Sequence, residues 1–396
     1  MTPGRYDRLP PYPFPRLRAL LDGHPPGQAP INLSIGEPQH PIPGFVSQVI
    51  AAETAGFGRY PAMEGTPALR QAIATWLTRR YALPQGLIDA DRHVLALNGT
   101  REGLFSAAVA LVPLRKAGER PAVLMPNPFY QCYAGAAVAA GAEPVYLPAL
   151  RETRFLPDFK ALPIKLLERT AAVYLCSPTN PQGTCASLAD WTDLIALARA
   201  HDFVILADEC YAEIYDRVPP TGVLDAAART GSLSHVLAFH SLSKRSNLPG
   251  LRSGFAAGDP ALIARFLHLR HYGGAALPGP IQAASAAAWG EESHVEENRA
   301  RYRVKFDMAA HILGNRFGFY RPDGGFYLWL DVENGEMAAL KLWREAGLRV
   351  LPGRYLGYDA QENDPASNPG HPFIRIALVA DEATTETALR RIAACL

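Results

Sequence analysis

Two serines, a lysine and an arginine occur close together in the second half of the chain. The segment from 239 to 255 reads FHSLSKRSNLPGLRSGF and contains Ser241, Ser243, Lys244 and Arg252. Hydroxyl groups and a planar guanidinium are donors that bind a phosphate. A lysine amine beside a phosphate site indicates one cofactor, pyridoxal 5′-phosphate (PLP), bound as a Schiff base. The alternative for so short a motif is a surface turn with solvated side chains.

The elements around this motif predict an α/β fold. The run at 236–239 reads as a buried strand that places Lys244 at a strand end, where an α/β sheet presents its ligands. Helical patterns separate the apolar runs, which lie at 93–97, 122–125, 144–147, 171–175, 203–207, 236–239 and 254–257. Continuous apolar runs suit strands that are buried on both faces of a mostly parallel sheet.

Polar side chains follow several of these strands. Gly99, Thr100 and Arg101 come after the first run and open a helix, whose free backbone N–H groups bind anions. The second, fourth and fifth runs are followed by Tyr130, by Asn180, and by Asp208 with Tyr211. An aspartate after five apolar residues is costly to bury without a partner, although a helix N-cap is the alternative reading.

Three further residues stand outside the predicted sheet. Gly36 ends a short strand at a point where backbone can approach a ligand closely. Tyr60 precedes a helix that Thr66 is expected to cap, with Pro67 at its first position. Arg375 lies in the alternating run 373–378, where its side chain faces one side only. For each of these residues, a plain packing or solvated role is the alternative.

Composition narrows the class of protein. The 396 residues carry 39 basic and 38 acidic side chains, a net charge of +1, which argues against nucleic acid or a membrane surface as the main partner. The 5 cysteines form no C-x-x-C pair, so we expect reduced cytoplasmic thiols and no metal site. No secretory signal and no transmembrane run is expected.

Together these residues resemble the fold-type I PLP-dependent aminotransferases of class I/II. The resemblance extends from Ile31 to the C-terminus, and its most specific parts are SPTNPQG, ADECY and the SLSK…R stretch. It implies a mostly parallel seven-stranded sheet in a large domain and a smaller α+β domain. More narrowly, FHSLSKRSNLPGLRSGF, MPNPFYQCY and PYPFPRLRALL are similar to succinyldiaminopimelate transaminases of lysine and cell-wall biosynthesis.

The resemblance also implies roles for individual residues. Lys244 would be the Schiff-base lysine and proton shuttle, and Asp208 would pair with the pyridine nitrogen. Tyr211 and Asn180 would donate to the phenolate oxygen, Asn180 also lying at the substrate. The other implied contacts are Tyr130 on the pyridine face, Gly99, Thr100, Arg101, Ser241 and Arg252 at the phosphate, Gly36 and Arg375 at the substrate carboxylate, and Tyr60 at the neighbouring subunit's phosphate.

We therefore expect a homodimer with shared active sites. The predicted organisation is an N-terminal arm and small-domain segment at 1–45, a large PLP-binding domain at 46–280 and a small C-terminal domain at 281–396. Two residues depart from the family pattern: Gln182 replaces a usual Thr, and Arg101 occupies a position that is small or polar in many relatives.

The expected reaction is transamination of N-succinyl-LL-2,6-diaminopimelate with 2-oxoglutarate, which yields N-succinyl-2-amino-6-oxopimelate and glutamate. The alternatives are another aminotransferase with aspartate, aromatic or other acidic substrates, a PLP β-lyase, and a non-enzymatic PLP-binding regulator. The regulator would need a DNA-binding domain, and the arm before Ile31 is short for one. Charge and placement alone suggest candidates for reading the distal end of the substrate, namely Arg16, Arg18 and the loop 270–272.

Overall fold

The seven apolar runs form one sheet in the computed structural model, which describes residues 4–361 and 364–396. Its strands are β2 (Val94–Leu97), β3 (Ala122–Asn127), β4 (Glu143–Pro148), β5 (Thr170–Cys176), β6 (Val204–Asp208), β7 (Val236–Ser241) and β8 (Gly254–Gly258). Their order is β2-β8-β7-β6-β5-β3-β4. Only β8 runs antiparallel to its neighbours, so the sheet is mostly parallel and the predicted fold class is confirmed.

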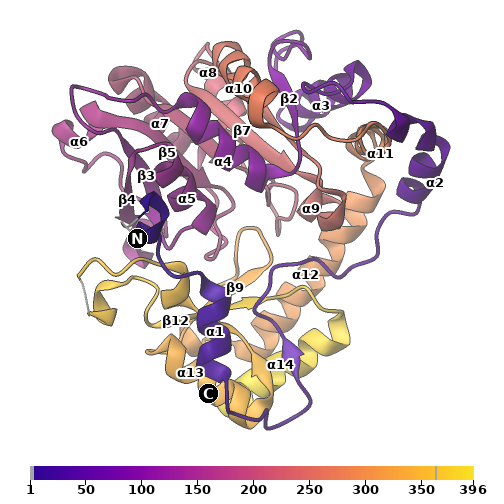
Figure 1. The fold of residues 1–396 in the computed structure, drawn as a ribbon. Helices are drawn as coiled ribbons and strands as arrows, with labels where there is room; N and C mark the ends of the chain where they lie inside the picture. The colour runs from indigo at the N-terminus through magenta and orange to yellow at the C-terminus, as the bar shows by residue number, and fades with distance from the viewer. Residues whose placement is uncertain (1–3, 362–363) are drawn as a thin grey trace.

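Helices cover both faces of this sheet (Figure 1). The helices of this larger part, including α2 at its outer edge and the short turn α9 after β7, are α2 (Phe45–Ala52), α3 (Pro67–Arg80), α4 (Thr100–Leu111), α5 (Gln131–Ala139), α6 (Ile164–Arg169), α7 (Leu188–His201), α8 (Val223–Arg229), α9 (Leu242–Arg245), α10 (Pro260–Gly273) and α11 (Gly279–Gly290). Thr66 caps α3 as predicted, because its side chain accepts from the Leu69 N–H and Pro67 stands at the first position. Ser187 and Asp190 form a capping box at the start of α7.

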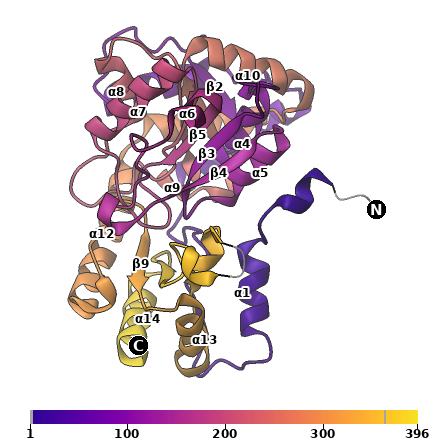
Figure 2. The ribbon, with the colours of Figure 1, turned by 90° about the vertical axis from the view of Figure 1, so that its left-hand side faces the viewer.

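A smaller α+β part lies below the sheet in Figures 1 and 2. It contains α1 (Pro13–Leu21), β1 (Ile31–Asn32), α12 (Ser293–Leu313), β9 (Tyr327–Asp331), α13 (Gly335–Ala346), β10 (Leu348–Arg349), β11 (Leu351–Pro352), β12 (Phe373–Ala377) and α14 (Glu382–Cys395). The strands β11, β12 and β9 form an antiparallel sheet, and β1 pairs with β10. A separate hydrophobic cluster fills this part, with Tyr302, Phe306 and Leu342 fully buried.

Short 3-10 helices occupy several connections. They are η1 (Arg5–Arg8), η2 (Thr54–Gly58), η3 (Arg151–Thr153), η4 (Pro249–Leu251), η5 (Arg316–Gly318), η6 (Gly353–Leu356) and η7 (Pro365–Ser367). The domain boundaries at 45 and 280 stay a prediction, and the first three residues of the arm lie outside the described residues.

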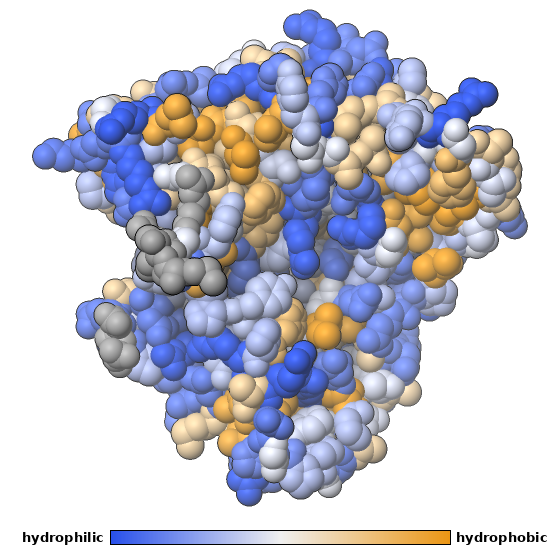
Figure 3. Space-filling view, in the orientation of Figure 1, coloured by the Kyte–Doolittle hydropathy of each residue, from blue (hydrophilic) through white to orange (hydrophobic). Residues whose placement is uncertain are grey.

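Helix α12 connects the two parts. It begins beside α9 and α11 and runs down into the smaller part (Figure 1). Figure 3 shows a hollow between the parts that hydrophilic residues border, with hydrophobic side chains gathered on the upper surface around it. The strand ends that carry the predicted site residues face this junction.

Candidate active site

A cavity of about 490 Å³ collects most of the predicted site residues. Its lining includes Gly36, Thr100, Arg101, Tyr130, Asn180, Asp208, Tyr211, Ser241, Lys244, Arg252 and Arg375. These residues come from strand ends of the large sheet, from the segment after β1 and from β12 of the smaller sheet. The cavity is therefore built by both parts of the molecule, and neither part alone encloses it.

Lys244 lies in α9, the single helical turn after β7. Its Nζ donates a hydrogen bond of 2.5 Å to the carbonyl oxygen of Gly36. Burial lowers the pKa of this amine to about 8, while the guanidinium of Arg375 acts in the same direction. An amine with this pKa is neutral for part of the time near neutral pH, as a nucleophile or a general base requires.

Gly36 is a position where only glycine fits. A Cβ on Gly36 would lie 1.8 Å from the hydroxyl oxygen of Tyr327, far inside any van der Waals contact. The backbone at Gly36 thus packs directly against Tyr327, and the Gly36 carbonyl accepts the hydrogen bond from Lys244. The prediction that the backbone at Gly36 comes close to the site is consistent with this geometry.

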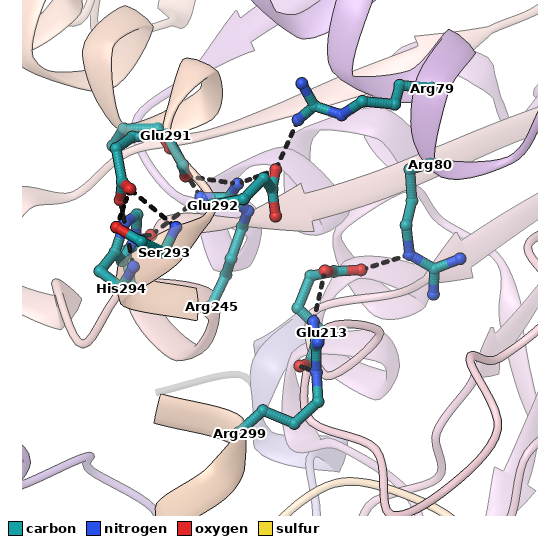
Figure 4. Close-up of polar contacts among 11 residues, drawn as sticks. Arg79, Arg80, Glu213, Arg245, Glu291, Glu292, Ser293, His294 and Arg299 are labelled. Carbon is teal, nitrogen blue, oxygen red and sulfur yellow. Dashed lines mark hydrogen bonds and ion pairs between the residues drawn. The ribbon is translucent and has the colours of Figure 1, made fainter. Parts of the chain in front are cut away.

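The residue after Lys244 anchors the turn that carries this lysine (Figure 4). The buried guanidinium of Arg245 donates to the Glu292 carboxylate at 2.7 Å and to the Ala288 carbonyl at 2.7 Å. Arg79 of α3 donates to the same carboxylate at 2.7 Å. The junction of α11 and α12 thereby fixes the main chain that carries Lys244.

Asp208 ends β6 and is buried. Burial raises the pKa of this carboxyl, and hydrogen bonds to it act in the opposite direction. The hydroxyl of Tyr133 donates to its Oδ2 at 2.7 Å, and the Cys210 N–H donates to its Oδ1 at 3.3 Å. Burying a carboxylate without an opposite charge is costly, and the contacts of Asp208 among the described residues are these hydrogen bonds and not an ion pair.

Arg375 lies on the central strand of the smaller sheet and not on an edge. Its side chain is buried: Nη1 donates to Asn180 Oδ1 at 3.0 Å and Nη2 donates to the Ser34 carbonyl at 2.8 Å. The guanidinium lies 4.3 Å from the ring centroid of Tyr327. The solvated alternative for Arg375 is therefore wrong, and its planar fork is held at the cavity wall.

Tyr211 reaches the same wall. Its hydroxyl lies 3.2 Å from that of Tyr327, and burial raises the pKa of Tyr211 well above its usual value. Tyr211 is thus a neutral hydroxyl that can donate into the cavity. Tyr327, which the sequence reading left without a role, packs against Gly36, Tyr211 and Arg375.

The predicted phosphate donors meet at one place. Gly99 adopts a φ of +83°, and a Cβ there would lie 2.4 Å from Arg252 Nη2. Arg252 also has a positive φ of 57°, a strained conformation for a side-chain-bearing residue that is typical of functional sites. Ser241 caps α9, and its Oγ lies 2.9 Å from Ser243 Oγ. Thr100 begins α4, whose first N–H groups are free for an anion.

Arg101 does not join this cluster by a hydrogen bond. Its Nε donates to the Tyr130 hydroxyl at 2.5 Å, and its guanidinium carbon lies 5.7 Å from the Tyr130 ring centroid. Tyr130 in turn packs edge-on against Tyr133, with ring centroids 5.5 Å apart. Arg101 therefore presents a cation on the cavity wall beside the aromatic rings.

Some candidates lie away from the cavity. Tyr60 is fully exposed and does not line it, as expected of a residue that would serve a neighbouring subunit. Arg16 stacks 3.9 Å from the Tyr355 ring centroid, and Arg18 is exposed. The predicted loop at 270–272 is wrong, because these residues lie in the last turn of α10. Arg270 is buried, paired with Glu102 and outside the cavity lining, so the suggestion that it reads the substrate's distal end is wrong for this chain.

The sequence reading missed Tyr133 and Cys210, which bind Asp208. Tyr133 stands three residues after Tyr130 in MPNPFYQCY, and Cys210 lies within ADECY, so both are present in motifs that were already noted. Only the spacing along α5 and the turn after β6 could have indicated them. Among the described residues, no cluster of His, Cys, Asp and Glu side chains could hold a metal ion.

The comparison with known proteins agrees with this geometry. A family model for class I and II aminotransferases matches residues 28–392. The chain belongs to this family. This aminotransferase is 34% identical over 392 residues to the 4-dedimethylamino-4-oxo-anhydrotetracycline transaminase OxyQ of Streptomyces rimosus, which covers 97% of this chain and 99% of the relative. It is 30% identical to an LL-diaminopimelate aminotransferase of Dehalococcoides mccartyi, over 98% of this chain and 97% of that protein.

Solved structures give the same family. An aminotransferase from Neisseria meningitidis superposes with a TM-score of 0.92 and 42% identity, and 98% of each chain is covered. A probable N-succinyldiaminopimelate aminotransferase from Thermus thermophilus superposes with a TM-score of 0.84 and 25% identity, over 97% of this chain and 100% of that one. The predicted family and fold are thereby confirmed.

Enzymes of this family use PLP, and the cavity fits that cofactor. Hydroxyls, a guanidinium and the start of α4 suit a phosphate dianion. A buried carboxylate with no cation of its own suits a protonated pyridine nitrogen. Lys244 would supply the amine, and Tyr130 would supply an aromatic face. No described helix is long and apolar enough to cross a membrane.

Proposed function

We propose that this aminotransferase exchanges the amino group of N-succinyl-LL-2,6-diaminopimelate with 2-oxoglutarate. The observation that carries the proposal is the presence of two guanidinium groups, those of Arg375 and Arg101, on the wall of the cavity that holds Lys244. A substrate with a carboxylate at each end needs one cation for each. Lys244 and Arg252 have other partners in this proposal, so Arg101 remains for the distal carboxylate.

The roles proposed for the other residues follow from their chemistry. Bound PLP supplies an electron sink for the carbanion that forms at the substrate Cα. Lys244, with its pKa lowered by burial, removes the Cα proton and returns one to the product side. Asp208 stays ionised against the ring nitrogen, and Tyr211 with Asn180 donates to the ring oxygen. Arg375 orients the substrate through its α-carboxylate, with Gly36 lining the approach.

Unsuccinylated LL-diaminopimelate is the second candidate substrate. Its support is the likeness to LL-diaminopimelate aminotransferases at 30–31% identity. That substrate carries a free distal ammonium, which an acidic side chain would bind. Glu37, an exposed residue, lines the cavity and is the side chain suited to that contact. In the succinylated substrate an amide N–H replaces the ammonium, so the charge on Glu37 matters less.

A homodimer is part of the proposal. Tyr60 is fully exposed and outside its own cavity, so its side chain is free to enter the cavity of a second copy. A cytoplasmic location also stays a prediction, which the five free cysteines support because disulfides mark oxidising compartments. Light scattering after size exclusion would test the dimer, and a monomer with full activity would contradict shared sites.

The test of the substrate is a panel of half-reactions on the PLP-loaded enzyme. N-succinyl-LL-diaminopimelate, LL-diaminopimelate, glutamate, aspartate and tyrosine are each mixed with it, and the loss of the bound cofactor's absorbance is followed. We expect the succinylated substrate to have the highest kcat/KM and glutamate to react as the second substrate. Release of pyruvate and ammonia in place of transamination would identify a β-lyase.

Two variants test how the distal end of the substrate is bound. Arg101→Met should reduce kcat/KM by at least about tenfold, which corresponds to about 1.4 kcal/mol, for the succinylated substrate and for LL-diaminopimelate, because both carry a distal carboxylate. Alanine, which has no distal carboxylate, serves as the control substrate and should be unaffected. Glu37→Gln should spare the succinylated substrate and damage LL-diaminopimelate. If wild-type enzyme ignores both substrates and prefers aspartate or tyrosine, the aminotransferase assignment stands and the proposed substrate is wrong.

A further inference from the structure

A lysine side chain is completely buried in α12. Lys305 has 0% exposure, although lysines are rarely buried without an ionic partner. Its Nζ donates to His40 Nε2 at 2.7 Å, to the Leu378 carbonyl at 3.0 Å and to the Ala380 carbonyl. All three ammonium donors are thus used, but no ion pair joins Lys305 to a carboxylate within the described residues. Burial lowers the pKa of Lys305 to about 8, while the nearby carboxylates of Glu382 and Asp381 act in the opposite direction, so its three hydrogen bonds hold a side chain whose burial is costly.

His40 connects Lys305 to Asn298 through its two ring nitrogens. Its Nε2 accepts from Lys305, so the ring proton must lie on Nδ1, which donates to Asn298 Oδ1 at 2.7 Å. Burial, chiefly, lowers the pKa of His40 to about 4, which keeps the imidazole neutral. The amide of Asn298 is then oriented with its donors pointing away from His40.

The amide donors of Asn298 contact α9, the turn that carries Lys244. Asn298 Nδ2 donates to the carbonyl oxygen of Lys244 at 3.2 Å and to that of Arg245 at 3.4 Å. Asn298 is buried, and it lies in α12, whose N-cap residue Glu292 binds Arg245 in Figure 4. A continuous set of hydrogen bonds therefore runs from Lys305 through His40 and Asn298 to the main chain of Lys244.

The other end of this set meets the chain just after the strand of Arg375. Leu378 and Ala380 directly follow β12, the strand that carries Arg375. His40 belongs to the segment whose Ser34 carbonyl accepts from Arg375 and whose Gly36 carbonyl accepts from Lys244. Lys305, His40 and Asn298 thus connect β12, which carries Arg375, to α9, which carries Lys244.

We propose that Lys305, His40 and Asn298 are positioning residues that hold the main chain of Lys244 at a fixed place relative to Arg375. The inference rests on the proposed function, in which Arg375 holds the substrate carboxylate and Lys244 moves the Cα proton. Proton transfer needs the amine within hydrogen-bond reach of the reacting carbon. A displacement of about 1 Å can cost about a hundredfold in rate.

The test compares four substitutions at and around His40. His40→Leu breaks the connection, and His40→Gln keeps an acceptor for Lys305 and a donor for Asn298. Tyr302→Phe is the matched control, because the Tyr302 ring packs 4.7 Å from that of His40 while its buried hydroxyl has no hydrogen-bond partner among the described residues. Asn298→Ala removes the last link and serves as a second disrupting variant if His40→Leu does not fold.

Three measurements separate positioning from stability. They are kcat and KM for glutamate in the half-reaction, the pH titration of the bound cofactor's absorbance, and the rate at which each apo-protein recaptures added PLP. We expect His40→Leu to retain PLP but to lose at least about tenfold in kcat with KM nearly unchanged. The midpoint of its absorbance titration should move by about half a unit or more, and PLP recapture should slow. His40→Gln should recover most of each loss, and Tyr302→Phe should match the wild type.

Two results would overturn the inference. The first is a folded His40→Leu or Asn298→Ala variant with wild-type kcat, absorbance titration and recapture rate. The second is a loss that follows only the melting temperature and PLP content, with no recovery in a folded His40→Gln. Borohydride labelling of the wild type at a lysine other than Lys244 would instead contradict the proposed function itself.

Discussion

The hydroxyl of Tyr133 donates a hydrogen bond of 2.7 Å to the buried carboxylate of Asp208. Tyr133 is itself held by Tyr174, whose ring stacks on it at 4.4 Å with an interplanar angle of 6°. Burial raises the pKa of Asp208, and the Tyr133 hydrogen bond opposes that rise. Tyr133, supported by Tyr174, thus helps to keep Asp208 charged, and Asp208 is the carboxylate that we assign to the cofactor nitrogen.

Tyr133→Phe should therefore weaken the hold of Asp208 on PLP. A hydrogen bond to a charged group contributes about 1.5–3 kcal/mol, so we expect PLP release to accelerate by at least about tenfold. Tyr174→Phe is the control, because its hydroxyl donates to the Leu104 carbonyl and not to Asp208. The measurement is the decay of cofactor absorbance after dilution. Equal release rates in the two variants would remove Tyr133 from this function.

Asp208→Ala tests the carboxylate directly. The variant should bind PLP weakly and lose most of its turnover, because an unprotonated pyridine is a poor electron sink. We expect a loss of several kcal/mol in transition-state stabilisation, with about tenfold in rate for each 1.36 kcal/mol. Single-turnover rates at saturating PLP measure this effect. Near-normal turnover with full cofactor occupancy would contradict the role assigned to Asp208.

Much of this site could be predicted because its residues follow buried strands. Continuous apolar runs indicate where β5, β6 and β7 end, and parallel strands bring those ends to one edge of the sheet. Asn180, Asp208 and Lys244 therefore had to lie close together once the sheet was predicted. The register of the sheet confirms that their strands are neighbours.

The rest depended on contacts that no local pattern encodes. Tyr133 reaches Asp208 across 75 positions of sequence, and Lys305 reaches His40 across 265. Arg270 illustrates the opposite error, since charge and placement suggested a substrate contact while the fold buries it against Glu102. Side-chain partners over such separations follow from packing, which a single sequence does not reveal.

Arg375→Lys tests the substrate clamp. An arginine fork makes two parallel hydrogen bonds with a carboxylate, and lysine does not copy that geometry. Both half-reactions bind an α-carboxylate, so kcat/KM should fall by similar factors for glutamate and for N-succinyl-diaminopimelate, with PLP content unchanged. If kcat/KM fell for only one of the two substrates, Arg375 would bind the substrate's side chain and not its α-carboxylate.

The amine of Lys244 should react as a weak base. Burial lowers its pKa from 10.5 to about 8, so the neutral form becomes dominant above pH 8. The rate at which apo-protein captures PLP should rise with pH and level off a little above pH 8, whereas a free lysine amine continues to gain reactivity up to about pH 10.5. Apo Lys244→Ala reports the contribution of other lysines. A capture rate that still rises steeply above pH 9 would contradict the lowered pKa.

Attachment of the cofactor is the most direct test of the assignment. The wild-type protein is loaded with PLP, reduced with borohydride, digested, and mapped by mass spectrometry. Ser241, Arg252 and Asp208 surround one lysine in the cavity, so the pyridoxyl group should lie on Lys244 alone. A label on another lysine, or PLP-loaded protein that carries no label after reduction, would contradict the proposed active site.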